Sequence, residues 1–259
     1  MNSTLRKFLL WYLPLTSALA GATLFGYGFY AGVSGNAGVR VAGDVSGKPL
    51  AIAQKPQDSL RIVLLGDSLA RGVGDERGLG IGGSVEEELK KKKLKYSDTT
   101  NLAVSGSKTP DLVKQLEGRS VRTLIAEANV VIVSIGGNDL FGSAVGGREG
   151  PPADVGVIMD QVRGRVTSIV KTVRATNPNA RIFVIGLYNP FSMNPSGAML
   201  NPLVNRWNAN LVSAFEGDAR LTVVQTADLF THRDRLSADR FHPGAEAYGI
   251  IGRRIAESL

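Results

Sequence analysis

The segment Arg61-Ile62-Val63-Leu64-Leu65-Gly66-Asp67-Ser68 decides the fold, because an uninterrupted apolar run stops there at a glycine and two small polar residues. Apolar runs that contain β-branched residues are typical of strands buried on both faces, as in parallel sheets. Four later segments have a similar composition, namely residues 101–104, 130–135, 181–187 and 221–224. We therefore predict a five-stranded parallel sheet that begins with residues 61–65.

Amphipathic segments lie between these strands and predict the helices that connect them. They are residues 84–94, 110–117, 121–128, 154–176, 201–216 and 245–259. Strands that alternate with helical crossovers indicate a three-layer α/β sandwich with helices on both faces of the sheet. Such sheets bind ligands beyond the carboxyl ends of their strands, so we expect functional residues in the loops that follow the strands.

Glycines and small polar residues follow the first three predicted strands. The first loop reads Gly66-Asp67-Ser68-Leu69, the second contains Gly106, and the third reads Gly136-Gly137-Asn138-Asp139. A serine on a tight turn after a strand can act as a nucleophile, while backbone amides and an Asn side chain can stabilise an oxyanion. Taken singly, each loop is also explained by ordinary helix caps and turns.

The segment Asp239-Arg240-Phe241-His242-Pro243 places a carboxylate three residues before an imidazole. A serine hydrolase needs a base that titrates near neutral pH and a carboxylate that orients this base. One short loop can supply both groups. The other histidine of the chain, His232, is interpreted as a loop residue without a catalytic role.

Ser68, Gly106, Asn138 and the Asp239/His242 pair, in this order, resemble the four sequence blocks of the GDSL/SGNH hydrolase family. The resemblance covers residues 60–258. It implies the flavodoxin-like five-stranded fold of that family and the activity of a carboxylic ester hydrolase. The segment from Gly186 to Phe191 is similar to the lipase/acylhydrolase branch found in Gram-positive bacteria.

The resemblance also implies a role for each matching residue. Ser68 is expected to be the nucleophile, His242 the general base and Asp239 the residue that orients it. The backbone amides of Ser68 and Gly106 and the side chain of Asn138 are expected to form the oxyanion hole. No metal ion or cofactor is expected.

The loop after the fourth predicted strand holds three candidates for substrate binding, Asn189, Phe191 and Met193. Packing within the loop explains them equally well. Asp67 is expected to support the turn that carries Ser68 rather than to act as a second base.

Composition sets wider limits. Apolar residues make up 43% of the 259 residues and charged residues 20%, which is enough for an ordinary core, and the absence of cysteine excludes disulfides and thiol chemistry. The net charge of +7 includes a lysine run at residues 90–95 that follows residues 86–88, all Glu. On a helix this run predicts the pairs Glu86–Lys90 and Glu87–Lys91 on a solvated face, so we expect no nucleic-acid partner.

Arg6 and Lys7 precede a stretch without charge that continues to Arg40, and its most apolar part spans residues 8–33. This part exceeds the roughly 20 residues that a membrane helix needs, and the preceding positive charges place the rest of the chain outside the membrane. Cleavage near Ala20 is the alternative, and it would release a secreted protein. We therefore predict an anchor or signal at residues 1–33, a linker at 34–58 and a catalytic domain at 59–259.

The expected partner is an ester of a lipid or of an acylated cell-envelope component. The sequence also allows a carbohydrate O-acetylesterase, a transacylase, or a cell-envelope binding protein without activity. It leaves the acyl length, the natural substrate and the oligomeric state open.

Overall fold

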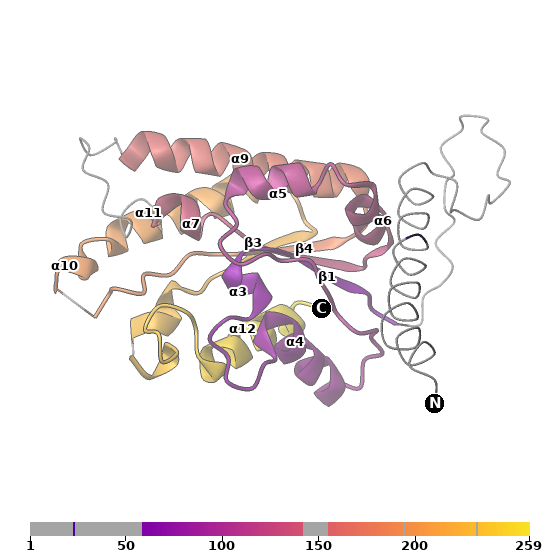
Figure 1. The fold of residues 1–259 in the computed structure, drawn as a ribbon, viewed down its shortest axis with the longest axis horizontal. Coiled ribbons are helices and arrows are strands. Elements are labelled where there is room, and N and C mark those ends of the chain that lie inside the picture. Colours follow the sequence, from indigo (N-terminus) through magenta and orange to yellow (C-terminus); the bar gives the residue numbers. More distant parts are fainter. Residues whose placement is uncertain (1–22, 24–58, 142–154, 194, 232) are drawn as a thin grey trace, which may run out of the picture. The chain divides into compact units, whose positions relative to one another are not determined.

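Figure 1 shows the computed structural model of the chain, which describes residues 59–141, 155–193, 195–231 and 233–259 together with Thr23. The chain divides into two compact units, Met1–Ala53 and Gln54–Leu259, and the fold described below is that of the second unit. The predicted anchor at residues 1–33 and linker at 34–58 lie outside the described residues, apart from Thr23, and stay predictions. Within the part that is described, no helix is both long and apolar enough to cross a membrane.

Five parallel strands form one sheet, in the order β2-β1-β3-β4-β5, which confirms the predicted architecture. The strands are β1 (Ile62–Gly66), β2 (Thr100–Asn101), β3 (Val130–Ser134), β4 (Arg181–Ile185) and β5 (Leu221–Val224). The chain places β2 on one side of β1 and then crosses to place β3 on the other side. The direction of winding thus reverses beside β1, and a crevice is expected where the strands next to this point end.

Helices cover both faces of the sheet (Figure 1). One layer holds α5 (Thr109–Gln115), α6 (Arg119–Glu127), α9 (Val155–Thr176) and α11 (Asn201–Phe215). The opposite layer holds α3 (Ser68–Arg71), α4 (Gly80–Lys91), α12 (Ala245–Glu257) and the 3-10 segment η2 (Ala227–Thr231). Shorter elements are α7 (Gly137–Leu140), α10 (Pro195–Ala198) and η3 (Arg233–Arg235).

Alternate side chains of each central strand enter the two cores. On β1, Val63 and Leu65 belong to the core beneath α9, whereas Ile62 and Leu64 belong to the core beneath α4 and α12. All four side chains are buried. Burial on both faces is the physical reason for the uninterrupted apolar run in the sequence.

Two predicted elements have different limits in the structure. The strand predicted at residues 101–104 is reduced to Thr100–Asn101, although the amides of Leu102 and Val104 still donate to carbonyl groups of β1. The helix predicted from residue 84 begins at Gly80, and its glycines let it approach its neighbours closely. A Cβ atom on Gly82, for example, would lie 3.0 Å from Cγ2 of Thr99.

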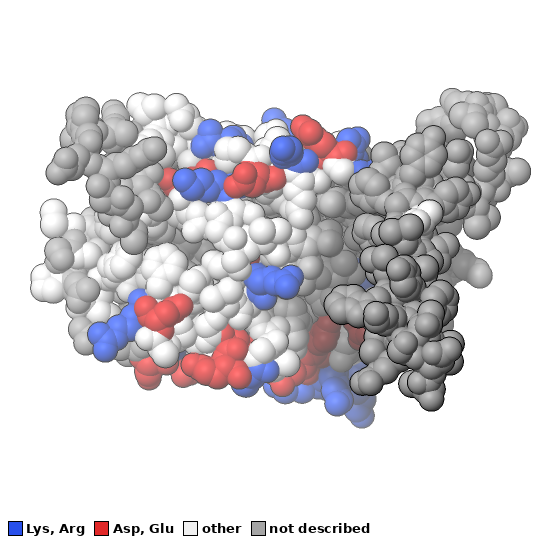
Figure 2. Space-filling model, in the orientation of Figure 1, with Lys and Arg blue, Asp and Glu red and all other residues white. Residues whose placement is uncertain are grey.

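The predicted Glu–Lys pairs on α4 were wrong in their partners. Glu86 accepts a hydrogen bond from the amide of Thr99, Glu87 contacts Arg77, and Glu88 pairs with Lys91 at 2.7 Å. The glutamates therefore join α4 to neighbouring loops as well as to its own lysines. In Figure 2 most Lys and Arg side chains on the visible face lie near Asp or Glu, so the charge there is mixed in sign.

Candidate active site

Ser68 lies directly beyond the carboxyl end of β1, at the first position of α3. Gly66 turns the chain there with φ +134°, and the amide of Asp67 donates to the carbonyl oxygen of Ser134 at the end of β3. The Asp67 carboxylate caps α3 by accepting from the amide of Leu69 at 3.1 Å. The turn thereby places Ser68 at the reversal point of the sheet, half-buried.

The imidazole of His242 reaches this serine from a loop 174 residues further along the chain. Its Nε2 atom lies 2.9 Å from Oγ of Ser68, and its Nδ1 atom lies 2.6 Å from Oδ2 of Asp239. A neutral imidazole with the proton on Nδ1 would donate to Asp239 and accept from the Ser68 hydroxyl. The structure therefore joins the three predicted side chains in one hydrogen-bonded series.

The other oxygen of Asp239 organises the loop itself. Oδ1 accepts from the Ser237 hydroxyl at 2.6 Å and from the amides of Phe241 and His242, each at 2.9 Å. Partial burial raises the pKa of Asp239, but these hydrogen bonds and the one to the imidazole outweigh it and hold the pKa well below its usual range. Asp239 is consequently a carboxylate at neutral pH, as the partner of an imidazolium must be.

Asp67 has the opposite electrostatic character. Burial raises its pKa to about 7, against hydrogen bonds from backbone amides and from the Ser134 hydroxyl that favour the ionised form. Its place beneath the turn agrees with the expected structural role. Its side chain caps the helix that Ser68 begins.

This pKa predicts a pH dependence of stability. The folded protein binds the proton on Asp67 more tightly than the unfolded chain does, so this group lowers stability as pH rises from about 4 to about 7, by at most about 1.4 kcal/mol per pH unit. Asp67→Asn keeps an oxygen for the helix cap and should flatten that slope in urea unfolding curves. Asp160→Asn, at an exposed carboxylate on α9, is the control and should keep the wild-type slope. An unchanged slope in the Asp67 variant would contradict the prediction.

Asn138 follows the third strand, where Gly136 adopts φ +109° at the start of α7. The Asn138 side-chain amide donates to the carbonyl oxygen of Ser107 at 3.0 Å, which joins the third loop to the second. Asp139 strengthens this junction by accepting from the amide and the hydroxyl of Thr109, at 2.9 and 2.6 Å. The loops after β2 and β3 are thus held together beside Ser68.

Gly106 occupies the turn after β2 with φ +84°, and no atom lies within 4 Å of the position that a Cβ would take. It precedes Ser107, the residue that Asn138 binds. Gly106 is not one of the residues that line the cleft at Ser68, whereas Asn138 is. The geometry thus brings Asn138 to the cleft and leaves Gly106 in the adjoining turn.

An open cleft of about 40 Å³ contains Ser68, Asn138 and His242. Its wall is mainly apolar. The other lining residues are Asp67, Leu69, Ser134, Gly137, Phe141, Leu187, Tyr188, Pro190 and Phe241. An acyl chain could be received by these side chains next to a polar reactive centre.

The three predicted substrate residues are placed differently from one another. Asn189 is buried, and its side-chain amide donates to the carbonyl oxygen of Gly197 and to the side chain of Asn201. It lines a separate cavity of about 470 Å³. The ring centre of Phe191 lies 6.0 Å from that of Phe241, one residue from His242. Met193 is 40% exposed. None of the three lines the cleft at Ser68.

Several cleft residues escaped the sequence analysis. Tyr188 donates to the carbonyl oxygen of Phe241 at 2.7 Å, and Phe241 meets the His242 ring edge-on at 5.1 Å. Phe241 stood inside a recognised segment, but nothing in the sequence showed that its carbonyl group would bind Tyr188, 53 residues away. His232 lies outside the described residues. Within the described part, no group of three or more His, Asp or Glu side chains could hold a metal ion.

The parallel sheet with its hydrogen-bonded Ser, His and Asp side chains at the reversal point defines an α/β protein with the site architecture of a serine hydrolase. The chain belongs to the GDSL-like Lipase/Acylhydrolase family, whose sequence model matches residues 64–250. Membership of this family indicates, in general terms, that the protein is an ester hydrolase. The recognised resemblance to GDSL/SGNH hydrolases is thereby confirmed.

The chain is also similar to individual known proteins. The chain is 30% identical over 222 residues to YpmR, an uncharacterized protein of Bacillus subtilis (strain 168), covering 82% of this chain and 86% of YpmR. The lipase Lip_vut3 from a goat rumen metagenome superposes with a TM-score of 0.69 at 22% identity, over 77% of this chain and 97% of that chain. Axe2, an acetylxylan esterase from Geobacillus stearothermophilus, gives 0.59 at 17% identity, over 77% and 94%. These two likenesses show the shared fold.

Proposed function

We propose that the protein is a serine ester hydrolase that works through an acyl-Ser68 intermediate. The observation that carries this proposal is the distance of 2.9 Å between Oγ of Ser68 and Nε2 of His242, with Asp239 at 2.6 Å behind the imidazole. A proton can pass over a hydrogen bond of that length as the nucleophile attacks. Membership of the GDSL-like Lipase/Acylhydrolase family supports this activity.

In the proposed mechanism Oγ of Ser68 attacks the ester carbonyl carbon while Nε2 of His242 takes the hydroxyl proton. The carbonyl electrons move to oxygen, and the tetrahedral intermediate then collapses and expels the alcohol, which receives the proton from His242. Water attacks the acyl-enzyme by the same route, with His242 first accepting and then returning a proton. Asp239 remains ionised throughout and stabilises the imidazolium.

The oxyanion would be stabilised by the Asn138 side chain and the amide of Ser68, to which the family resemblance adds the amide of Gly106 in the adjoining turn. Replacement of Asn138 with alanine removes one neutral donor and should lower kcat by about 100- to 1000-fold. KM should change less, because the charge develops only in the transition state. Steady-state kinetics with an activated ester measures both constants.

The Asn138 amide also binds the carbonyl oxygen of Ser107, so the variant needs a control for folding. Ser107→Ala keeps that carbonyl group and should retain the wild-type kcat. Circular dichroism would show whether the Asn138 variant stays folded. If the folded Asn138 variant kept its full kcat, Asn138 would have no part in the oxyanion hole.

A fluorophosphonate probe tests the proposed function directly. It should modify the wild-type protein at one serine, Ser68, which peptide mass spectrometry would locate. A folded protein that never reacts, and that hydrolyses no ester, would be the non-catalytic binding protein that the sequence also allowed.

A carbohydrate O-acetylesterase is the second candidate beside a hydrolase of lipid or cell-envelope esters. Axe2, of similar fold, is an acetylxylan esterase. A panel of esters from acetyl to palmitoyl, with lysophospholipid and acetylated glycan, separates these candidates, and transfer to an added alcohol would identify a transacylase.

We also propose that residues 8–33 hold the enzyme at the outer surface of a membrane. The length of the stretch without charge and the preceding Arg6 and Lys7 support this location. Membrane fractionation combined with mass measurement of the mature amino terminus tests it. Recovery of the chain cut near Ala20 would favour secretion, and an uncut chain found wholly in the cytosol would contradict export.

A further inference from the structure

The loop between α3 and α4, residues 72–79, lies directly against the segment that carries His242. Gly74 makes the approach possible. A Cβ atom on it would lie 2.6 Å from the carbonyl oxygen of Pro243 and 2.8 Å from Cβ of His242, both closer than van der Waals contact allows. The 72–79 loop, which follows α3 and Ser68 in the chain, therefore packs against the backbone of His242 and Pro243.

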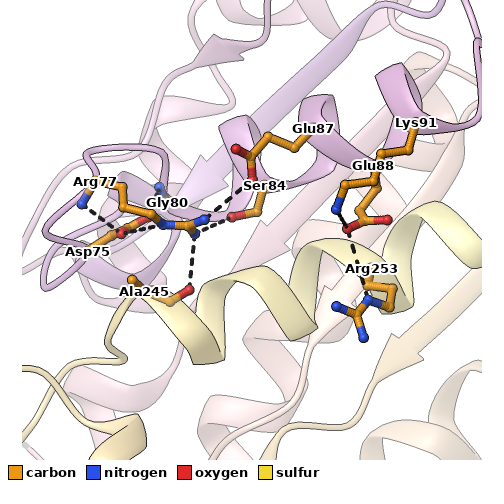
Figure 3. A network of polar contacts seen from close by, with 9 residues as sticks. All are labelled: Asp75, Arg77, Gly80, Ser84, Glu87, Glu88, Lys91, Ala245 and Arg253. Carbon is orange, nitrogen blue, oxygen red and sulfur yellow. Dashed lines mark hydrogen bonds and ion pairs between the residues drawn. The ribbon is translucent and has the colours of Figure 1, made fainter.

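Asp75 and Arg77 hold this loop in shape, as Figure 3 shows. The Asp75 side chain has no exposed surface and accepts from the amides of Arg77 and Gly80, at 3.0 and 2.9 Å. The same carboxylate lies 3.4 Å from Nε of Arg77. The position of the guanidinium is thus set from within the loop.

The guanidinium of Arg77 reaches out of the loop to α12. Nη2 donates to the carbonyl oxygen of Ala245 at 3.0 Å and lies 3.4 Å from Oγ of Ser84, while Nη1 lies 3.4 Å from Glu87. Ala245 is the first residue of α12, three positions after His242. Arg77 therefore links the 72–79 loop to the first residue of α12, the helix that follows His242 in the chain.

Tyr248 provides a second connection between the same two segments. Its hydroxyl group donates to the carbonyl oxygen of Val73 at 2.7 Å. Close packing of α12 on α4 supports both connections, since a Cβ on Gly252 would lie 2.6 Å from Cβ of Ser84. The nucleophile and the base thus belong to segments that are fastened to each other independently of the Ser68–His242 hydrogen bond.

We propose that Arg77, held by Asp75, is a positioning residue that keeps the His242 imidazole within proton-transfer distance of Ser68 by fastening the 72–79 loop to the start of α12. The inference rests on the proposed hydrolase function. Arg77 touches neither Ser68 nor the cleft, so it acts through the backbone around His242. Its planar fork of N–H donors suits several acceptors at once, which a lysine ammonium on a flexible stem does not reproduce.

Kinetics of Arg77→Ala and Arg77→Lys test this role. A displacement of a catalytic group by about 1 Å can lower the rate by about 100-fold, so Arg77→Ala should lower kcat by about 10- to 100-fold and leave KM within about twofold. Phosphonylation of Ser68 should slow in parallel. Arg77→Lys should recover only part of the loss. All rates are to be measured well below the melting temperature of each variant.

Arg174→Ala is the matched control. Arg174 also binds several acceptors, among them Asp218 and the carbonyl oxygens of Pro178 and Ala180, but these lie just before β5 and β4 and do not line the cleft. Its loss should lower the melting temperature without lowering kcat. An arginine with a purely structural role would behave in this way. Comparing kcat of Arg77→Ala with kcat of Arg174→Ala therefore separates an effect on the position of His242 from an effect on stability.

Nuclear magnetic resonance gives a reading that is independent of substrate. The chain contains two histidines, so labelling with [15N]histidine yields two ring spin systems, and a His232→Gln variant assigns them. In the wild type the Nδ1 proton of His242 should be protected by its bond to Asp239. In Arg77→Ala this signal should broaden through faster exchange with solvent.

The outcomes separate two failures. A wild-type protein that does not react with the fluorophosphonate would overturn the proposed function and the inference with it. A reactive wild type whose Arg77→Ala variant keeps kcat within twofold and an unchanged His242 spectrum would overturn the inference alone. Should the alanine variant not fold, a folded Arg77→Lys variant with full kcat would overturn it equally.

Discussion

Replacement of Ser68 with alanine should lower kcat by about 10⁵- to 10⁶-fold and abolish labelling by a fluorophosphonate. In the proposed mechanism the hydroxyl oxygen of Ser68 forms the covalent bond to the acyl group, and among the described residues it is this oxygen that lies 2.9 Å from Nε2 of His242. His242→Ala should lose activity to a similar extent, since Oγ then has no base. The double variant should be no worse than either single variant, because the two groups act as one unit.

Ser213→Ala, at an exposed position on α11, is the matched control and should keep wild-type kinetics. Single-turnover measurements with an activated ester resolve the acylation step in each variant. Melting curves would show that the Ser68 variant remains folded. Activity of a folded Ser68 variant above about one hundredth of the wild-type value would place the nucleophile elsewhere.

Gly66→Ala should strongly destabilise the sheet. A Cβ at this position would lie 1.8 Å from the carbonyl oxygen of Ser134, and the backbone adopts φ +134°, which L side chains avoid. Backbone strain of about 1–3 kcal/mol and overpacking of about 1–3 kcal/mol together predict a loss of about 2–6 kcal/mol in the free energy of unfolding. Such a loss is a large fraction of the stability of an ordinary domain.

Gly164→Ala is the control for this prediction. It lies within α9, where no atom is found within 4 Å of an added Cβ, so alanine should stabilise the protein by about 0.5–1 kcal/mol. Urea unfolding followed by tryptophan fluorescence, with Trp207 buried, measures both variants. Equal stabilities of the Gly66 variant and the wild type would mean that β1 and β3 end differently from the geometry described.

The sheet could be predicted from the sequence because β1, β3 and β4 are buried on both faces, and such strands appear in the sequence as apolar runs. β2 lies at an edge, and its Asn101 is used to bind the carbonyl oxygen of Ala70, so its composition gave a weaker signal. The start of α4 was hidden for a different reason. Glycines are poor helix formers, and those near its beginning are present for close packing rather than for helix propensity.

The candidate site was predictable where its chemistry is local. Asp239 and His242 are three residues apart, and Asp67 and Ser68 are neighbours, so sequence spacing fixes their relation. Asn189 was proposed for the substrate pocket, but its amide groups are taken up by partners in its own loop and in α11. The contact of Arg77 with the carbonyl group of Ala245 spans 168 positions and depends on the packing of α4 on α12. No local pattern carries that information.

The two ends of the hydrolase fold lie on one rim of the sheet. Leu60, just before β1, bridges to Tyr96, and Arg181, the first residue of β4, binds the carbonyl oxygens of Ser258 and Leu259 at the carboxyl terminus. Ser68 stands beyond the opposite rim, where the strands finish. A fusion partner, purification tag or solid support joined at this rim would therefore leave the side that carries Ser68 turned towards free solution.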